Sequence, residues 1–153
     1  TNTFDLTFIR SSSNRIWIGL LGTAGGKGYV YEWDGVSSQV TRSYRLQAQG
    51  ALACVIKDDI PWIIDTNGRL LAWNGATFVE KGRLPLVRDQ FLVNATATSN
   101  NRFIHPNGIS IIDGQINLLV NNVNDDNGAT INENLPSGIW EYDESVGLYH
   151  NNL

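Results

Sequence analysis

The feature that most constrains the fold of this chain is a short segment that recurs. Residues 28–35 read GYVYEWDG and residues 68–75 read GRLLAWNG, so both run Gly, four residues, Trp, Asp or Asn, and Gly. A third segment, residues 138–143, reads GIWEYD; it is one residue shorter and has Tyr in place of Trp. Self-similarity of this kind indicates a repeat architecture. The residues that define the repeat are Gly28, Trp33, Gly35, Gly68, Trp73, Gly75, Gly138 and Tyr142.

The second copy of the repeat predicts a β-hairpin. The apolar residues of 69–73 alternate between two faces, with Trp73 on one of them, as side chains of an extended strand do. Asn74 and Gly75 both accept positive φ, which predicts a two-residue type I′ turn after this strand. The returning strand is expected at 77–83.

Four short strands fit each of the three units, because short apolar runs alternate with turn signals. Apolar residues do not recur with a period near 3.6 residues over three turns, so almost no helix is expected. The strands expected in the first unit are 4–9, 15–21, 29–33 and 39–46. Those expected in the second unit are 51–57, 62–65, 69–73 and 77–83. The third unit is expected to contain a hairpin over 108–120 that turns at Asp113-Gly114, the segment 138–143 and a last strand that includes His150.

We therefore expect an all-β chain that forms one repeat domain of three units, 1–47, 48–85 and 86–153. Three four-stranded antiparallel units at a spacing near 40 residues predict blades of a β-propeller. The alternative is a β-trefoil, which also has three units of four strands. Trp33 and Trp73 lie 40 residues apart but Trp73 and Tyr142 lie 69 apart, and this inequality favours the propeller.

Three blades leave the outer faces of the first and third units uncovered, because closed propellers have about four to eight blades. These faces are expected to present Tyr29, Tyr31, Ile139 and Trp140. Apolar area of that extent rarely stays uncovered on a monomer. The chain contains no Met, and we interpret both of its ends as cut from a longer chain. The expected partners are therefore further blades of that longer chain or another copy of this one.

Two parts of the sequence resemble known families. The strand endings Trp-Asp-Gly and Trp-Asn-Gly, followed in the second unit by TFV at 77–79 and RLP at 83–85, resemble degenerate kelch-like blades, which implies a propeller. The closing segment, PSGIWEYD at 136–143 with GLYH at 147–150, resembles stretches in virion proteins of tailed bacteriophages. That resemblance implies a virion protein of the tail, fibre or baseplate, whose partners are neighbouring virion subunits or a glycan on the host surface.

Composition excludes two classes of partner. The 11 basic and 15 acidic residues give a net charge of −4 without a basic cluster, so no nucleic-acid partner is expected. No apolar run approaches the roughly 20 residues that cross a bilayer, so no membrane association is expected. The single cysteine, Cys54, cannot form an internal disulfide and is interpreted as a small core residue.

One loop invites a metal-binding interpretation. Asp125, Asp126 and Glu133 could supply oxygen ligands to calcium from one short segment. Aligned on the EF-hand template, however, the segment fails at the first and twelfth ligand positions, which are Val123 and Asn134. A solvated loop is favoured, and no metal or other cofactor is expected.

The remaining candidates are aromatic and acidic residues. Trp33, Trp73 and Tyr142 could offer flat surfaces to sugar rings, but residues repeated in every unit usually pack between units. The close carboxylates, at Asp58-Asp59 and within 141–144, stand beside turns, and neither histidine, His105 or His150, has the neighbours of a catalytic triad. No catalytic residue is therefore predicted.

The expected function is a non-catalytic structural or interaction propeller domain of a phage virion. The first alternative is a glycan-binding domain of a secreted or surface protein. The second alternative is part of a glycosidase-type propeller, which would place paired carboxylates across a cleft.

Overall fold

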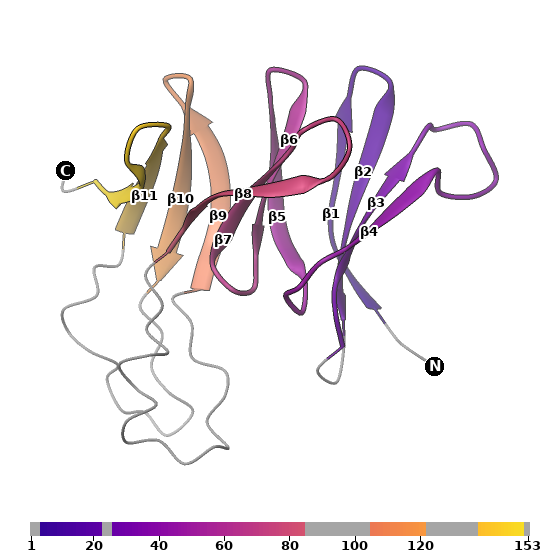
Figure 1. Ribbon diagram of the computed structural model, residues 1–153, viewed down its shortest axis with the longest axis horizontal. Coiled ribbons are helices and arrows are strands. Elements are labelled where there is room, and N and C mark those ends of the chain that lie inside the picture. The colour runs from indigo at the N-terminus through magenta and orange to yellow at the C-terminus, as the bar shows by residue number, and fades with distance from the viewer. Residues whose placement is uncertain (1–3, 23–25, 85–104, 122–137, 152–153) are drawn as a thin grey trace, which may run out of the picture.

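The computed structural model describes residues 4–22, 26–84, 105–121 and 138–151, and the whole of this part is built from strands and their connections. Twelve strands form three antiparallel sheets of four, each made from four consecutive strands (Figure 1). No helix occurs in these residues. The described part of the chain therefore contains no helix long and apolar enough to cross a membrane. The predictions of an all-β chain and of three four-stranded antiparallel units are confirmed.

The strand boundaries follow the sequence closely. The first sheet consists of β1 (Phe4–Ser12), β2 (Arg15–Gly22), β3 (Tyr29–Trp33) and β4 (Arg42–Arg45). The second consists of β5 (Ala51–Lys57), β6 (Ile60–Asp65), β7 (Arg69–Trp73) and β8 (Phe78–Arg83). The third consists of β9 (His105–Ile112), β10 (Gln115–Asn121), β11 (Gly138–Asp143) and β12 (Gly147–His150). Strands β3, β5 and β7 match their predicted ranges, whereas β1 extends to Ser12 and β4 is shorter than expected.

The sheets stand side by side in chain order, with the first at the right of Figure 1 and the third at the left. Each is a simple meander in which every strand pairs with the next one along the chain. The first strand of the second sheet, β5, contacts both β1 and β9, so the first strands of all three sheets lie next to one another. The described strands do not close into a ring.

Two hairpins turn through pairs of residues with positive φ. Asp58 and Asp59, at φ 51° and 63°, join Lys57 to its partner Ile60. Asp113 and Gly114, at φ 50° and 78°, make the predicted turn of the third unit. Positive φ at both central residues is the signature of the type I′ turn, whose twist matches that of the flanking strands.

The type I′ turn predicted at Asn74-Gly75 is wrong. Trp73 pairs with Phe78, so four residues connect β7 and β8, and of the two predicted turn residues only Gly75 has positive φ, at 101°. The cause is the Asn74 side chain, whose Oδ1 accepts hydrogen bonds from the backbone N–H groups of Ala76 and Thr77, both at 2.9 Å. This local capping holds the chain in a wider loop.

The polar residue after the repeated aromatic has the same task in all three units. Asp34 Oδ1 accepts the N–H groups of Val36 and Ser37 at 2.9 and 2.8 Å, and Asp143 Oδ1 accepts that of Ser145 at 2.7 Å. The hydroxyl groups of Ser37 and Ser145 also donate to these carboxylates, and these bonds, followed by the backbone ones, lower the pKa of both carboxyl groups because they favour the charged form. The Asp or Asn of the repeat is thus explained by turn capping.

The glycine that begins the repeat is explained by close backbone contact in the first unit and by positive φ in the second. A Cβ at Gly28 would lie 2.3 Å from the Cα of Gly50, so no other residue fits where the first and second units meet. Gly68 has φ +73°, which disfavours any side chain. The carbonyls of Gly28 and Gly68 each accept the N–H of a buried leucine that ends the unit, Leu46 or Leu84.

The core is divided into two clusters, one at each junction between neighbouring sheets. The cluster between the first and second sheets contains Phe8, Trp17, Val30, Leu46, Ala51, Cys54, Ile63 and Leu71. The cluster between the second and third contains Ile64, Leu70, Leu84, Ile116, Leu118, Val120, Trp140 and Tyr142. Cys54 is buried, as expected, and burial raises the pKa of its thiol to about 12.

Candidate functional site

Both junctions between sheets are built around the same pair of aromatic positions. The ring centroids of Trp17 and Trp73 lie 5.2 Å apart at an interplanar angle of 60°, and those of Trp62 and Tyr142 lie 5.3 Å apart at 52°. In each pair the first residue comes from the second strand of one sheet, and its partner is the last or next-to-last residue of the third strand of the next sheet. Trp73 and Tyr142 therefore each pack against the preceding sheet.

Polar contacts reinforce the first junction. Glu32 is only 4% exposed; its Oε1 accepts from Arg15 Nε at 2.6 Å and its Oε2 from the Tyr44 hydroxyl at 2.6 Å. The same hydroxyl oxygen accepts the indole N–H of Trp73, at 3.3 Å, across the junction. The Arg15 guanidinium lies 4.7 Å from the centroid of the Trp73 ring. Burial and the hydrogen bond to Glu32 raise the pKa of Tyr44 above its ordinary value.

Trp33 holds the repeat position of Trp73 and Tyr142 but lies on a face that no described strand covers. Strand alternation places it opposite the buried Val30 and Glu32, which point to the second sheet. Its indole N–H donates to the Ser37 carbonyl at 2.8 Å. We call this face the open face of the first sheet. The large apolar residues that share it by strand register are Phe4, Leu6, Ile9, Ile16, Ile18, Leu20, Tyr29, Tyr31 and Trp33, and the polar residues are Ser11, Ser43 and Arg45.

The open face of the first sheet is largely apolar and partly exposed to solvent. Leu6 is 59% exposed and Ile9 is 53% exposed. Tyr29 makes ring contacts with Phe4 and Tyr31, at centroid distances of 5.6 and 6.0 Å. Tyr29 and Tyr31 thus lie where the sequence predicts them.

The open face of the third sheet is mixed in polarity. Ile139 lies on it as expected, in register with the exposed Leu119, but Asn117 and Glu141 share the same face. The prediction that Trp140 lies there is wrong: its side chain is 6% exposed and belongs to the core cluster between the second and third sheets. Strand alternation is the reason, because Trp140 precedes the inward-facing Tyr142 by two residues and must point the same way.

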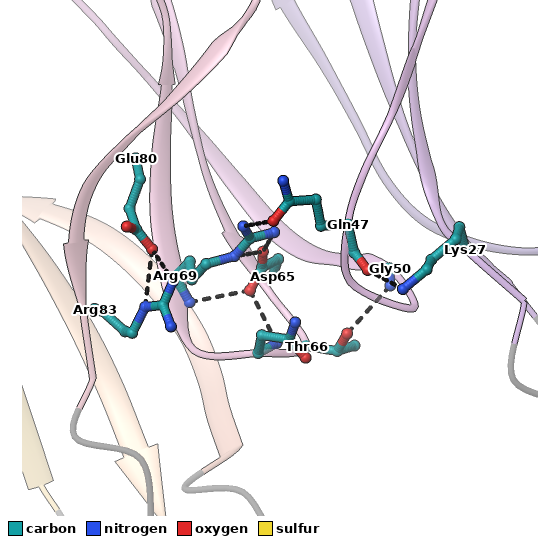
Figure 2. A network of polar contacts seen from close by, with 9 residues as sticks. Lys27, Gln47, Gly50, Asp65, Thr66, Arg69, Glu80 and Arg83 are labelled. Atoms are coloured by element: carbon teal, nitrogen blue, oxygen red, sulfur yellow. Dashed lines mark hydrogen bonds and ion pairs between the residues drawn. The ribbon is translucent and has the colours of Figure 1, made fainter.

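A buried ion pair that the sequence analysis did not identify lies at the base of the second sheet (Figure 2). Asp65 has no exposed surface, and its Oδ2 accepts from Nε and Nη2 of Arg69, both at 2.7 Å. Its Oδ1 accepts the N–H groups of Asn67 and Arg69 at 2.9 and 3.0 Å. Burial raises the pKa of Asp65, and the bonds from Arg69 oppose that rise. The signal in the sequence was an acid and an arginine on either side of the Asn67-Gly68 turn.

The same network reaches the first unit. Arg69 Nη1 donates to Gln47 Oε1 at 3.0 Å, and the Gln47 carbonyl accepts from Lys27 Nζ (Figure 2). Gly50 N–H donates to the Thr66 hydroxyl at 3.2 Å. The connection between the first two sheets is therefore fixed to the second sheet by side chains of both.

A groove of about 430 Å³ opens beside this network, between β4 of the first sheet and β7 and β8 of the second. Its positively charged lining residues are Arg45, Arg69 and Arg83, and its one lining carboxylate is Glu80. Arg83 donates to Glu80 Oε1 from Nε and Nη2, at 2.9 and 2.8 Å. Arg45 is exposed, and its pairing with Tyr29 places its side chain on the face opposite Tyr44.

Aromatic and neutral polar groups complete the groove. Tyr44 and Phe78 line it and contact each other edge to face, at 5.4 Å and 86°. Thr77 and Gln47 add hydroxyl and amide groups to the lining. The groove can therefore offer cations, aromatic rings and neutral hydrogen-bonding groups to a single ligand.

The acidic residues named as catalytic candidates accept hydrogen bonds from backbone N–H groups at turns. Asp59 Oδ1 accepts the N–H of Ser13 at 2.7 Å, and this contact lowers the pKa of Asp59. Asp143 caps the turn before β12. His150 packs its ring 5.6 Å from that of Trp140.

The weak calcium candidates Asp125, Asp126 and Glu133 lie outside the described residues, as does the side chain of His105. In the described part of the chain, no three His, Cys, Asp or Glu side chains gather where a metal ion could be held.

The chain matches no protein-family model, no curated protein and no solved structure.

Proposed function

We propose that the three sheets are consecutive blades of a β-propeller and that the chain is a non-catalytic interaction domain of a virion, in its tail, fibre or baseplate. The observation that carries the proposal is the repeated junction. Trp17 meets Trp73, and Trp62 meets Tyr142, while Trp33 offers the same position on a face without a neighbouring sheet.

A junction that joins the front of one sheet to the back of the next can be repeated. Such head-to-tail contacts build either a ring, if the rotation closes, or an open array. Propellers are the ring solution for four-stranded antiparallel sheets, with about four to eight blades. The uncovered faces of the first and third sheets are then the places where further blades dock.

Strand pairing favours the propeller over the β-trefoil. Within the described residues, each strand pairs along its length only with strands of its own unit. Among these residues a single bridge, between Leu21 of β2 and Gly50 just before β5, joins different units. A trefoil needs extended pairing between units to form its central barrel.

The interaction role follows from the distribution of apolar and acidic groups. The open face of the first sheet carries nine large apolar residues, and uncovered faces of this extent mark interaction sites. The acidic candidates Asp59 and Asp143 hold turns. The virion assignment rests on the phage-like closing segment, which supplies strands β11 and β12 of the third sheet.

Size-exclusion chromatography with light scattering, over a range of concentrations, tests the proposal. We expect the 153-residue chain to associate, and the double variant Leu6→Glu/Ile9→Glu to shift it toward the monomer, because both side chains lie exposed on the open face. The matched control is Val36→Glu/Val146→Glu, which alters two residues that are 90% and 69% exposed in turns. A wild-type monomer at every concentration would overturn the proposal.

A further inference from the structure

We propose that two copies of the chain close one ring of six blades. The open face of the third sheet in each copy binds the open face of the first sheet in the other. This assignment rests on the proposed function, because it requires the three sheets to be propeller blades. It is supported by the two open faces, which repeat the two kinds of surface that already meet inside the chain.

Both junctions inside the chain have the same direction. The face that meets the next sheet carries Trp17 in the first sheet and Trp62 in the second. The face that meets the preceding sheet carries Trp73 in the second sheet and Tyr142 in the third. The open face of the first sheet carries Trp33 and is of this second kind, whereas the open face of the third sheet is of the first kind. Each open face therefore matches the other and not a copy of itself.

The open face of the third sheet repeats the carboxylate arrangement of the first junction. Glu141 holds the place of Glu32, because each is paired with the third residue of the second strand in its sheet. Glu32 Oε2 accepts from Tyr44 at 2.6 Å, and Glu141 Oε2 accepts from Asn151 at 3.2 Å. Each donor lies beside the residue two positions before its glutamate. In the first junction the Tyr44 hydroxyl also accepts the indole N–H of Trp73, so this arrangement receives the tryptophan of the neighbouring sheet.

One position differs, and the opposite face compensates for it. Asn117 of the third sheet stands where the first two sheets have a tryptophan. An asparagine is much smaller than a tryptophan, so a junction at this sheet needs more bulk from its partner. The open face of the first sheet supplies that bulk, because Tyr31 stands there at the position that Leu71 has in the second sheet.

The two open faces also agree in polarity. Both present exposed apolar side chains: Leu6 and Ile9 on the first sheet are 59% and 53% exposed, and Ile112 and Leu119 on the third are 49% and 47% exposed. The charges are opposite in sign, since Arg45 lies on the first face and Glu141 on the third. Opposite charges on facing surfaces favour their encounter and disfavour the pairing of like faces.

The number of blades selects two copies. Closed propellers have about four to eight blades. A ring of whole copies gains three blades with each copy, so two copies give six blades and three copies give nine. Only the ring of two stays within the range. If the rotation at the junction did not close, the same contact would add copies without limit.

Size-exclusion chromatography with light scattering measures the stoichiometry. We expect the wild-type chain to reach a mass twice the 16.9 kDa of one chain and to form no larger species as the concentration rises. Growth beyond two copies would contradict the closed ring but leave the proposed function standing, because the chain would still associate. A wild-type monomer at every concentration would overturn both.

Mixing two variants tests which faces meet. The first-face variant is Leu6→Glu/Ile9→Glu and the third-face variant is Ile112→Lys/Leu119→Lys, all at exposed positions. Each variant alone should raise the dissociation constant of the dimer at least about a hundredfold, because it places charges in both junctions of the ring. A mixed dimer has one junction with both faces unaltered. An equimolar mixture should therefore recover the two-copy species and lower the dissociation constant at least about tenfold.

Controls separate the loss of an interface from a loss of folding. Val36→Glu/Val146→Glu, which alters exposed turn residues, should remain dimeric. Circular dichroism melting establishes that each variant is folded. A third-face variant that associates like the wild type would show that first faces bind each other, and a mixture that stays monomeric would show that first and third faces do not meet. Either result would overturn the ring while wild-type association, and with it the proposed function, remains.

Discussion

The indole of Trp17 lies edge-on to that of Trp73, with their centroids 5.2 Å apart, and this contact joins the first sheet to the second. The two residues are separated by 56 positions in the chain (73 − 17). The contact is repeated one unit later by Trp62 and Tyr142. Aromatic pairs of this geometry contribute to stability beyond what the burial of their surface area alone provides.

The first prediction concerns this junction. Trp73→Ala should lower the free energy of unfolding by about 3 to 5 kcal/mol, because it removes a large side chain packed between two sheets. Chemical denaturation measures the loss. Trp33→Ala is the matched control, since Trp33 has the same place in the repeat but lies on an open face, and it should cost clearly less in a sample held monomeric. A Trp73 variant that loses under about 1 kcal/mol would show that the contact is not structural.

The second prediction concerns the buried ion pair. Asp65→Asn should destabilise the chain by about 3 to 5 kcal/mol, because it leaves the buried guanidinium of Arg69 without its counter-charge. Glu80→Gln breaks the exposed pair with Arg83 and should cost no more than about 1 kcal/mol. Both values come from urea denaturation at neutral pH. Similar losses for the two variants would contradict the interpretation.

A third prediction tests turn capping. Asn74→Ala removes the acceptor of two backbone hydrogen bonds and should cost about 1 to 2 kcal/mol. Asn74→Asp should be tolerated, because Asp34 and Asp143 cap the equivalent turns. Thermal melting of both variants beside the wild type decides the matter. If the aspartate variant is as unstable as the alanine variant, the amide nitrogen of Asn74 is needed and the shared capping role is wrong.

The fourth prediction is a pH dependence. The thiol of Cys54 has an ordinary pKa of 9.0, which burial raises to about 12 in the folded chain. Between these values the unfolded chain has lost a proton that the folded chain retains, so this contribution to stability is complete below pH 9 and declines as the pH rises toward 12. Denaturation at pH 8 and pH 10.5 should show a smaller decline for Cys54→Ala than for the wild type. Equal declines would show that the thiol contributes nothing to the pH dependence of stability.

Local patterns in the sequence predicted the elements but not the contacts between distant ones. Strands β3 and β7 match their predicted ranges, and Asp113-Gly114 turns as expected, because alternation and turn chemistry act over a few residues. The turn at Asn74 was predicted wrongly. An asparagine can adopt positive φ in a two-residue turn, or its side chain can accept backbone hydrogen bonds in a longer loop, and the sequence does not indicate which of the two occurs. Trp140 was assigned to the wrong face, although its spacing from Tyr142 held the answer.

The ion pair of Asp65 and the groove needed the structure. Arg69 is satisfied partly by Gln47, which belongs to the segment after β4, and the groove brings Tyr44 to the same place as Phe78. These contacts depend on how one sheet packs against the next. The spacing of residues along the chain does not indicate that packing.

Because the second sheet packs between the two others, local stability differs from one part of the chain to another. Both faces of the second sheet, which carry Ile63 and Ile64, are buried, whereas the first and third sheets are each covered on one side within the described residues. In a linear array, a unit in the middle gains two interfaces and a unit at the end gains one. Opening should therefore begin at the two ends and reach the middle unit last, so the backbone amides of β6 and β7 will be the last to exchange with solvent.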